Sequence, residues 1–409
     1  MGGVEQVIAQ HVRLFAQAGF PTLILAGRKA AETPAGVGPV VTVPELDSES
    51  PRYLAMADLL RHGQLPPEFA ALQEAIEGGL RAALRPDDIV IAHNVMTTHF
   101  NLALTAGVHH LLSAGQFPRL IIWCHDISRH VDPARAEPQY RGAPWDLLRT
   151  RLPQATYVAV SGARRRALAG ILDCPLEAIR LIPNGVDPVG LLSLSSLGEK
   201  LARAYDLLSA DLVLLMPVRI TRAKNIEFAM QVVAVLKQAG HTARLVVTGP
   251  PDPHAPDIDA YLQTLLDLRE RLSLREEVCF VYRGTRDAPQ PLLVDASVVA
   301  ELYRLADAVL MPSLREGFGM PVLEAALAGR PVFATSIPVT QDLPDFQQLI
   351  RADESPESVA RRILAWAESD GTYRMRRTVR RDYTWEGIFT RKILPLVEGL
   401  PDGEDEGQP

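Results

Sequence analysis

Short apolar runs alternate with amphipathic stretches along most of the chain, and this alternation predicts strands separated by helices. The predicted strands of the first half are Thr22–Ala26, Val40–Val43, Ile89–His93, Leu120–Cys124, Tyr157–Val160 and Ile179–Ile182, and the helices are Glu5–Ala18, Pro67–Leu84, Asn101–Leu112 and Ala163–Leu172. Those of the second half are strands Leu212–Val218, Arg244–Thr248, Val278–Tyr282, Ala308–Met311 and Pro331–Ala334, with helices Ile226–Gln238, Asp257–Leu272, Val299–Leu305 and Val322–Ala328. Apolar strands that alternate with helices are typical of parallel sheets covered on both faces, so the pattern predicts an α/β protein in two halves.

The length of 409 residues allows two or three domains. Several Ser and Gly residues in Asp187–Ala204 indicate a linker, which divides the chain into a first domain at residues 1–190 and a second at residues 205–373. A further helical stretch, about Trp385–Val397, follows the second sheet. Residues 399–409 form an acidic tail that we expect to be disordered.

Composition then narrows the class of protein. The chain is 47% hydrophobic and 22% charged, as in globular proteins with full cores, and its net charge of −7 argues against unspecific binding of nucleic acid. No run of about 18 uncharged apolar residues predicts a membrane span, and the first ten residues do not resemble a signal peptide. Cys124, Cys174 and Cys279 have neither metal-ligand spacing nor the pattern of a disulfide framework. We therefore expect a cytoplasmic protein.

The most informative stretch is Ser313–Thr335, which holds two carboxylates, Glu316 and Glu324, separated by seven residues. Its pattern predicts strand, glycine-containing loop, helix and strand. Pro321 suits the first helical turn, where its missing N–H costs nothing, and Gly329 is placed to end the helix near Ala328. A helix that starts after such a loop directs free backbone N–H groups toward a ligand and favours a phosphate there.

This stretch resembles the donor-site signature of the retaining glycosyltransferases of family 4, which have the GT-B fold. The resemblance implies two Rossmann-like domains facing across a cleft, with the terminal helices at residues 374–398 crossing back to the first domain. It implies that Glu316 holds sugar hydroxyls and that Glu324 holds the ribose of a nucleotide sugar. The residues expected to bind the donor are Gly2, Gly3, Gly249, Arg283, Gly317, Phe318, Gly319, Met320, Leu323 and Glu324.

Arg219 and Lys224 follow a predicted strand and therefore lie at the carboxyl edge of the second sheet, where ligands bind in open α/β folds. A guanidinium fork and an ammonium five residues apart suit a pyrophosphate, although a solvated basic loop would show the same two residues. The pair resembles the Arg and Lys with which family 4 enzymes neutralise the donor diphosphate. Arg222 is a further cation in this loop, to which we assign no role.

His125 and Asp126 end a strand of the first domain and so lie at the corresponding edge. In the family a His at this place lies near the transferred sugar, often within hydrogen-bonding distance of its hydroxyl, although a single His is more often structural. His93 and Asn94, at the end of the preceding strand, are weaker candidates for contact with the acceptor, together with Asp126.

Gly2-Gly3-Val4-Glu5 resembles the glycine loop that follows the first strand of family 4 enzymes, yet no strand precedes it. The first strand of a doubly wound sheet is central. We therefore expect a gap in the first sheet, or another strand that fills it. A late start, a trimmed chain and a true loss of the strand all remain open.

Other chemistries find little support. The single Asp-x-Asp sequence, Asp257-Ile-Asp259, opens a predicted helix, where acidic residues are better explained as a cap and first-turn charges than as metal ligands. We therefore expect no metal and no cofactor, because Arg219, Lys224 and helix dipoles can supply the positive charge. There is also no P-loop and no GxGxxG after a strand.

The sequence thus predicts a metal-independent retaining glycosyltransferase that moves a hexosyl unit from a UDP- or GDP-linked donor to a hydroxyl acceptor. His125, Arg219, Lys224 and Glu316 form the expected catalytic set. A nucleotide-sugar epimerase of the same fold and a non-catalytic partner subunit are the alternatives. Arg164-Arg165-Arg166 and the Arg374–Arg381 run could contact anionic lipid from the inner face of a membrane, although such runs are usually solvated helix faces.

Overall fold

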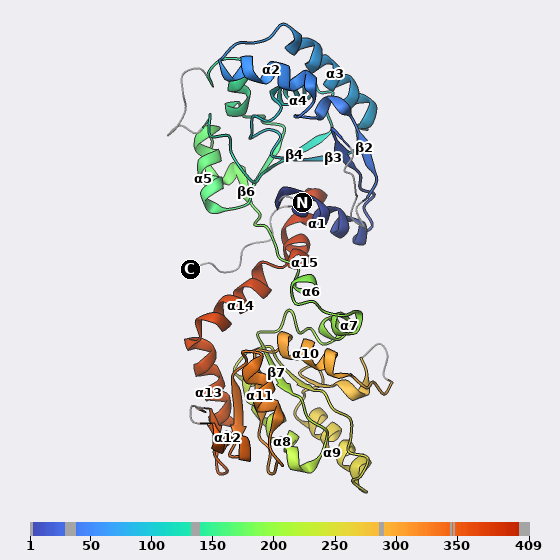
Figure 1. The fold of residues 1–409 in the computed structure, drawn as a ribbon, viewed down its shortest axis with the longest axis vertical. Coiled ribbons are helices and arrows are strands. Elements are labelled where there is room, and N and C mark those ends of the chain that lie inside the picture. The colour runs from blue at the N-terminus through green and yellow to red at the C-terminus, as the bar shows by residue number, and fades with distance from the viewer. Residues whose placement is uncertain are drawn as a thin grey trace. The chain divides into compact units, whose positions relative to one another are not determined.

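The computed structural model describes residues 3–28, 38–131, 140–285, 290–343, 346 and 348–400 (Figure 1). The chain divides into two compact units, one of Met1–Gly185 with Trp385–Pro409 and the other of Val186–Thr384. All paired strands described within both units are parallel, which confirms the predicted α/β class with two parallel-sheet domains. Gly2, a predicted donor residue, and tail residues 401–409 lie outside the described residues.

The first unit carries two separate sheets among the residues described, one of order β1-β2 and one of order β3-β4-β5-β6. Its strands are β1 (Ile24–Ala26), β2 (Val40–Thr42), β3 (Ile89–His93), β4 (Arg119–Cys124), β5 (Thr156–Ala159) and β6 (Ile179–Leu181). Its helices are α1 (Gly3–Gln17), α2 (Pro51–Arg61), α3 (Glu68–Ala83), α4 (Leu102–Ser113) and α5 (Gly162–Ile171), with short helical turns η1 (Pro44–Leu46), η3 (Trp145–Arg149) and η4 (Leu176–Ala178).

Residues 385–398 belong to the first unit. They form one helical stretch from α15 (Trp385–Ile388) through a π-helical turn, η7 (Phe389–Ile393), to α16 (Leu394–Glu398), as predicted. Phe389 packs edge-on against Phe15 of α1, with ring centroids 5.0 Å apart. Both guanidinium Nη atoms of Arg119 donate to the final carbonyls, those of Leu396 and Val397, at 2.6 Å each. A cation that binds carbonyls of the last helical turn stabilises the helix end.

The second unit has one sheet of order β12-β11-β10-β7-β8-β9. Its strands are β7 (Leu212–Met216), β8 (Ala243–Val247), β9 (Val278–Phe280), β10 (Ala308–Met311), β11 (Val332–Thr335) and β12 (Leu349–Ile350). Its helices are α6 (Pro188–Leu191), α7 (Ser196–Ala204), α8 (Ile226–Gln238), α9 (Ile258–Arg271), α10 (Ala296–Leu305), α11 (Met320–Leu327), α12 (Pro338–Asp342), α13 (Pro356–Ser369) and α14 (Gly371–Asp382), with turns η5 (Arg222–Lys224) and η6 (Val281–Arg283). Every residue of β7 and β10 is buried, as expected for central strands covered on both faces.

The segment expected to be a linker is helical instead. Asp187 caps α6 by accepting from the backbone N–H groups of Val189 and Gly190, and Ser195 caps α7 by accepting from Gly198. Leu201 on α7 is fully buried in the core of the second unit. Ser195, one of the serines that suggested a linker, is therefore an N-cap, as is Asp187, a role for which these side chains are well suited.

Helix α14 belongs to the second unit, so the terminal segment expected at residues 374–398 is shared between the two units. Arg377 donates to the carboxylate of Asp211, with Nη2–Oδ1 at 2.5 Å, and Arg380 donates to that of Asp307, at 2.8 Å. Arg376 binds the last carbonyls of α10. Three arginines of the basic run are thus bonded to their own unit, which leaves fewer of them available to a lipid surface.

Within the described ranges, no helix is both long and apolar enough to cross a membrane.

Candidate active site

The strand order of the second sheet reverses between β7 and β10. From β7 the chain adds β8 and β9 on one side, and then returns to place β10, β11 and β12 on the other side. Such a reversal leaves a crevice outside the carboxyl ends of the two strands, where ligands of open α/β sheets bind. The loops that follow β7 and β10 are those that hold Arg219, Lys224 and Glu316. Three of the four predicted catalytic residues therefore lie at the carboxyl edge of the second sheet, where the strand order reverses.

The loop after β7 offers one unpaired cation. Arg219 is exposed and forms no hydrogen bond or ion pair with any residue that the structure describes. Arg222 differs, because its guanidinium donates to Asp257 at 2.9 Å and lies 4.6 Å from the centroid of the Tyr261 ring. Asp257 occupies the N-cap position of α9, as predicted, but its carboxylate binds Arg222 instead of capping the helix. Of the two arginines, only Arg219 is free to bind an anion.

The loops after β7 and β10 meet at an ion pair. The Nζ of Lys224 donates to the Oε1 of Glu316 at 2.5 Å, and the hydroxyl of Ser313 donates to the same oxygen at 3.0 Å. The backbone N–H of Leu314 donates to the carbonyl of Ala223 at 2.8 Å, which ties the two loops together. The side chains of Lys224 and Glu316 are only 19% and 9% exposed. Glu316 is thus held in one orientation by two donors from different loops.

The start of α11 is set by Gly319. Its φ of 107° is in the left-handed region, and a Cβ there would come within 2.6 Å of Ile337 Cδ1 and 2.8 Å of Val339 Cγ1. Gly319 is the N-cap residue of α11, with Pro321 in the first turn, as predicted. Gly317 has open space around its Cα, so only Gly319 is required for packing. The exposed Phe318 and Met320 flank this start.

Glu324 lies on α11, one turn into the helix, and is exposed. The buried Tyr303 of α10 donates its hydroxyl to Oε2 of Glu324 at 2.7 Å. Burial and the neighbouring Glu324 carboxylate raise the pKa of the Tyr303 phenol, so Tyr303 is a neutral donor. Leu323, another predicted donor residue, is partly buried and packs on the core of the unit. Glu324 is thus oriented through one oxygen, which leaves the other available to a ligand.

Gly249 and Arg283 follow β8 and β9 at the same edge of the sheet. A Cβ on Gly249 would lie 2.4 Å from the carbonyl oxygen of Val218 and 2.7 Å from Cα of Arg219, so this glycine lets the end of β8 approach the loop that carries Arg219. Arg283 is exposed and has no ion pair among the described residues. Gly284, which follows it, has its carbonyl bound by the Tyr205 hydroxyl at 2.7 Å.

In the first unit, His93 and His125 are brought into contact. They end or follow the neighbouring strands β3 and β4, in which His93 pairs with Trp123. Nδ1 of His93 lies 2.9 Å from Nε2 of His125. Asn94 has a left-handed φ of 61°, and its side-chain oxygen accepts from the backbone N–H groups of His125 and Asp126. Its amide oxygen therefore holds the loop after β4.

Burial dominates the electrostatics of these histidines. It lowers the pKa of His125 to about 4 and that of His93 well below 6.5. Burial, together with the nearby His125, lowers the pKa of His11 on α1 to about 3. The exposed carboxylate of Asp126 is paired with Arg164 of α5 at 2.7 Å. The histidines are therefore neutral at pH 7, and the carboxylate of Asp126 does not pair with them.

Gly3, at the start of α1, is exposed, and a Cβ on it would meet nothing within 4 Å.

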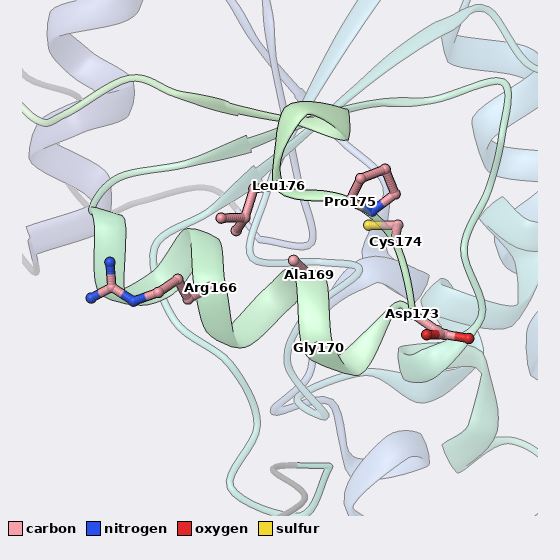
Figure 2. Close-up of a pocket in the computed structure, with 7 residues that line it drawn as sticks. All are labelled: Arg166, Ala169, Gly170, Asp173, Cys174, Pro175 and Leu176. Atoms are coloured by element: carbon pink, nitrogen blue, oxygen red, sulfur yellow. The ribbon is translucent and has the colours of Figure 1, made fainter.

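The described part of the first unit includes two hollows near its helices α5 and α2. One, of about 520 Å³, lies beside α5 and is lined by Arg166, Asp173 and Cys174 among others. Figure 2 labels its lining residues, and none of them is a predicted site residue. A second, of about 210 Å³, is lined by Tyr53, His99, Phe100 and Trp145, with Ser48, Glu49 and Arg61 among its polar residues. This one adjoins the loop after β4, because the Ser128 hydroxyl lies 2.9 Å from Nδ1 of His99.

Sequence reasoning missed the residues that orient the site. Ser313 and Tyr303 each bind one of the two predicted glutamates, and Arg164 binds Asp126. The hydroxyl of Thr335 donates to the carbonyl of Ser313 at 2.6 Å and so supports the loop after β10. Only Ser313, at the third position before Glu316, had a local spacing that could have indicated a contact. In the described part of the chain, no group of three or more His, Cys, Asp or Glu residues could hold a metal ion.

Curated relatives match parts of this chain. An uncharacterized glycosyltransferase of Methanocaldococcus jannaschii is 28% identical over 182 residues, which cover 44% of this chain and 42% of the relative. A D-inositol 3-phosphate glycosyltransferase of Stackebrandtia nassauensis is 30% identical over 167 residues, 39% of this chain and 34% of the relative. The matches thus span less than half the length of these relatives. Among solved structures, Anabaena HepE in complex with UDP aligns over 98% of this chain and 97% of its own, with 16% identity and a TM-score of 0.35.

Two family models together account for most of the chain. Residues 1–189 match the model described as Glycosyltransferase Family 4, and residues 199–381 match the model described as Glycosyl transferases group 1. The first match covers most of the unit that contains His93 and His125. The second covers the sheet edge that carries Arg219, Lys224 and Glu316. The chain belongs to the group 1, family 4 glycosyltransferases.

Proposed function

We propose that the protein is a retaining glycosyltransferase that moves a hexosyl unit from a nucleoside diphosphate sugar, UDP- or GDP-linked, to a hydroxyl acceptor. The observation that carries this proposal is the set of charged residues in the loops after β7 and β10, where the strand order of the second sheet reverses. An unpaired Arg219 lies there beside the Lys224–Glu316 pair, and the start of α11 lies on the same loop as Glu316. One such edge offers a cation for a diphosphate, a carboxylate for sugar hydroxyls and free backbone N–H groups for an anion.

In this proposal Arg219 and Lys224 stabilise the leaving diphosphate, whose negative charge grows in the transition state. Glu316 accepts hydrogen bonds from sugar hydroxyls, together with the backbone of residues 317–320. Glu324 accepts from the ribose through the oxygen that Tyr303 leaves free. No metal ion is required, because the cationic side chains supply the positive charge.

The chemical step follows what the family resemblance implies. The bond from the anomeric carbon to the diphosphate oxygen breaks, and a bond to the acceptor oxygen forms on the same face of the sugar. An oxygen of the departing diphosphate takes the acceptor proton, so no protein nucleophile is needed. His125 donates a hydrogen bond to a sugar hydroxyl at the edge of the first unit.

The acceptor is proposed to bind in the first unit, at the hollow beside the loop after β4. Phe100 is 61% exposed there and offers an apolar face, while Ser48, Glu49 and His99 are polar partners for hydroxyls. The curated name of the Stackebrandtia relative points to one acceptor of this chemistry, a phosphorylated polyol. Glycans, lipid-linked sugars and small metabolites all carry the required hydroxyl.

The test is release of nucleoside diphosphate from UDP-glucose, GDP-mannose and related donors by the full chain, with mixed hydroxyl acceptors. We expect release from one donor family, and Glu316→Gln should reduce it by about 100-fold. Recovery of an α-linked product from an α-linked donor supports retention. A folded protein that releases no diphosphate from any donor, or Glu316→Gln with unchanged activity, would overturn the proposal.

A further inference from the structure

Two histidines that the sequence offered as separate candidates form one unit. Nδ1 of His93 and Nε2 of His125 are 2.9 Å apart, and the rings are inclined by only 18°. Two neutral imidazoles share a hydrogen bond only if one nitrogen carries a proton and the other does not. The contact therefore couples the tautomer of His125 to that of His93.

The surroundings of His93 decide which ring donates. If His125 donated, His93 would carry its proton on Nε2, and no described residue offers a hydrogen-bond acceptor to that atom. Besides His125, the rings nearest to His93 are those of His11, at 5.3 Å between centroids, and Trp123, at 5.9 Å. If His93 donates from Nδ1, its Nε2 has only an unused lone pair. His93 is half-buried, and an unused lone pair there costs less than an N–H group that no protein group accepts.

We propose that His93 is a positioning residue that sets the tautomer of His125, so that His125 presents Nδ1–H as a hydrogen-bond donor to a sugar hydroxyl. Nδ1–H of His93 donates to Nε2 of His125, which leaves Nδ1 as the protonated nitrogen of the second ring. This inference rests on the proposed function of His125. It adds the reason why a particular nitrogen of that ring is the donor.

No neighbouring charge favours a protonated imidazolium in this pair. His11 of α1 faces His93, and its own two nitrogens are buried without a partner. Asp126 follows His125, but its carboxylate is bound to Arg164 of α5 and to the backbone N–H of Ile127. Burial accordingly lowers the pKa of both His93 and His125, and the pair stays neutral at physiological pH.

The experiment is imidazole 15N NMR of the full chain, labelled at histidine and free of ligand, for the wild type, His93→Phe and His93→Asn. Each variant is also assayed for kcat with the donor that the wild type uses. The wild type should show His125 protonated at Nδ1. In His93→Phe this preference should be lost, and kcat should fall by about 10- to 100-fold, the size typical of losing a second partner behind a functional histidine.

His93→Asn is the conservative variant, because its amide N–H can occupy the place of Nδ1–H. It should restore the Nδ1–H tautomer of His125 and most of kcat, which a purely structural role for the His93 ring would not predict. An Nε2–H tautomer of His125 in the wild type, or an unchanged tautomer in His93→Phe, would overturn the inference. The NMR result needs no substrate, so it is separate from a failure of the wild type to use any donor, which would overturn the proposed function instead.

Discussion

Lys224 and Glu316, 92 residues apart in the chain, form an ion pair with Nζ and Oε1 at 2.5 Å. The pair joins the loops after β7 and β10 at the point where the strand order of the second sheet reverses. It holds a carboxylate and a cation together, where the family of this chain is expected to hold its sugar donor.

The first prediction concerns the strength of this pair. Both side chains are largely buried, so removal of either partner leaves the other charge without compensation. Lys224→Met and Glu316→Gln should each lower the free energy of unfolding, and the double variant should lose less than the sum. Chemical denaturation of the four proteins should give a coupling of roughly 1–3 kcal/mol, between the values for exposed and buried pairs. Additive losses would show that the pair has no energetic coupling.

A second prediction compares two glycines of one loop. Gly319→Ala places a Cβ 2.6 Å from Ile337 Cδ1 at a φ of 107°, so it should lower the free energy of unfolding by about 1–3 kcal/mol. Gly317→Ala meets nothing within 4 Å and is the matched control, with little expected change. Thermal melts of both variants against the wild type check this. Equal melting temperatures for Gly319→Ala and Gly317→Ala would contradict the assigned role of Gly319 at the start of α11.

The third prediction concerns the orientation of Glu324. Tyr303→Phe removes the hydroxyl that donates to Oε2 of Glu324, and one such hydrogen bond is worth about 1 kcal/mol, or roughly fivefold in a dissociation constant. The affinity for the nucleotide donor should fall by that amount. Tyr261→Phe is the control, because its hydroxyl donates to Glu227 in the same unit at 2.8 Å without contacting a predicted donor residue. Calorimetric titration measures both, and equal losses in the two variants would contradict a specific role for Glu324.

The fourth prediction is a dependence of stability on pH. The pKa of His125 is lowered to about 4 in the folded state, so between that value and 6.5 the unfolded chain binds more protons than the folded one. Stability should therefore fall as the pH is lowered through this window. His125→Gln should reduce the slope by about 1 kcal/mol per pH unit between roughly pH 5 and 6. Urea denaturation across this range checks the slope, and an unchanged slope in His125→Gln would show that this imidazole is not held neutral by burial.

Local signals were sufficient for some strands and for the start and end of α11. The predicted bounds of Ile89–His93 and Ala308–Met311 agree with β3 and β10. The continuous apolar run marked the buried strand β10, whereas β3 is an edge strand in which only Ala92 is buried. Pro321 and Gly329 had positional meanings that needed no tertiary context. Helix α13 was not predicted, although Ser355 and the proline that follows it gave an N-cap signal.

The remaining features depend on contacts between distant residues. Helix α14 is rich in arginine, and the family resemblance predicts that it crosses to the first domain. Its contacts with Asp211 and Asp307, far away in sequence, place it in the second unit. The hydrogen bond from Tyr303 to Glu324 and the contact of His93 with His125 likewise join residues on different elements. Such contacts depend on the order of the strands in the sheet. A single sequence predicts the class of fold but does not give that order.

The measurement that tests the central claim most directly is a thermal-shift screen of the full chain with UDP, GDP, ADP and their sugar conjugates, without added metal. A ligand that binds only the folded state must stabilise it. The account predicts a shift with one nucleotide family in the wild type and in Arg222→Ala, whose arginine is already bound to Asp257, and no shift in Arg219→Ala. No shift with any nucleotide in a folded wild type, or the same shift in Arg219→Ala, would contradict a donor site at the β7–β10 edge.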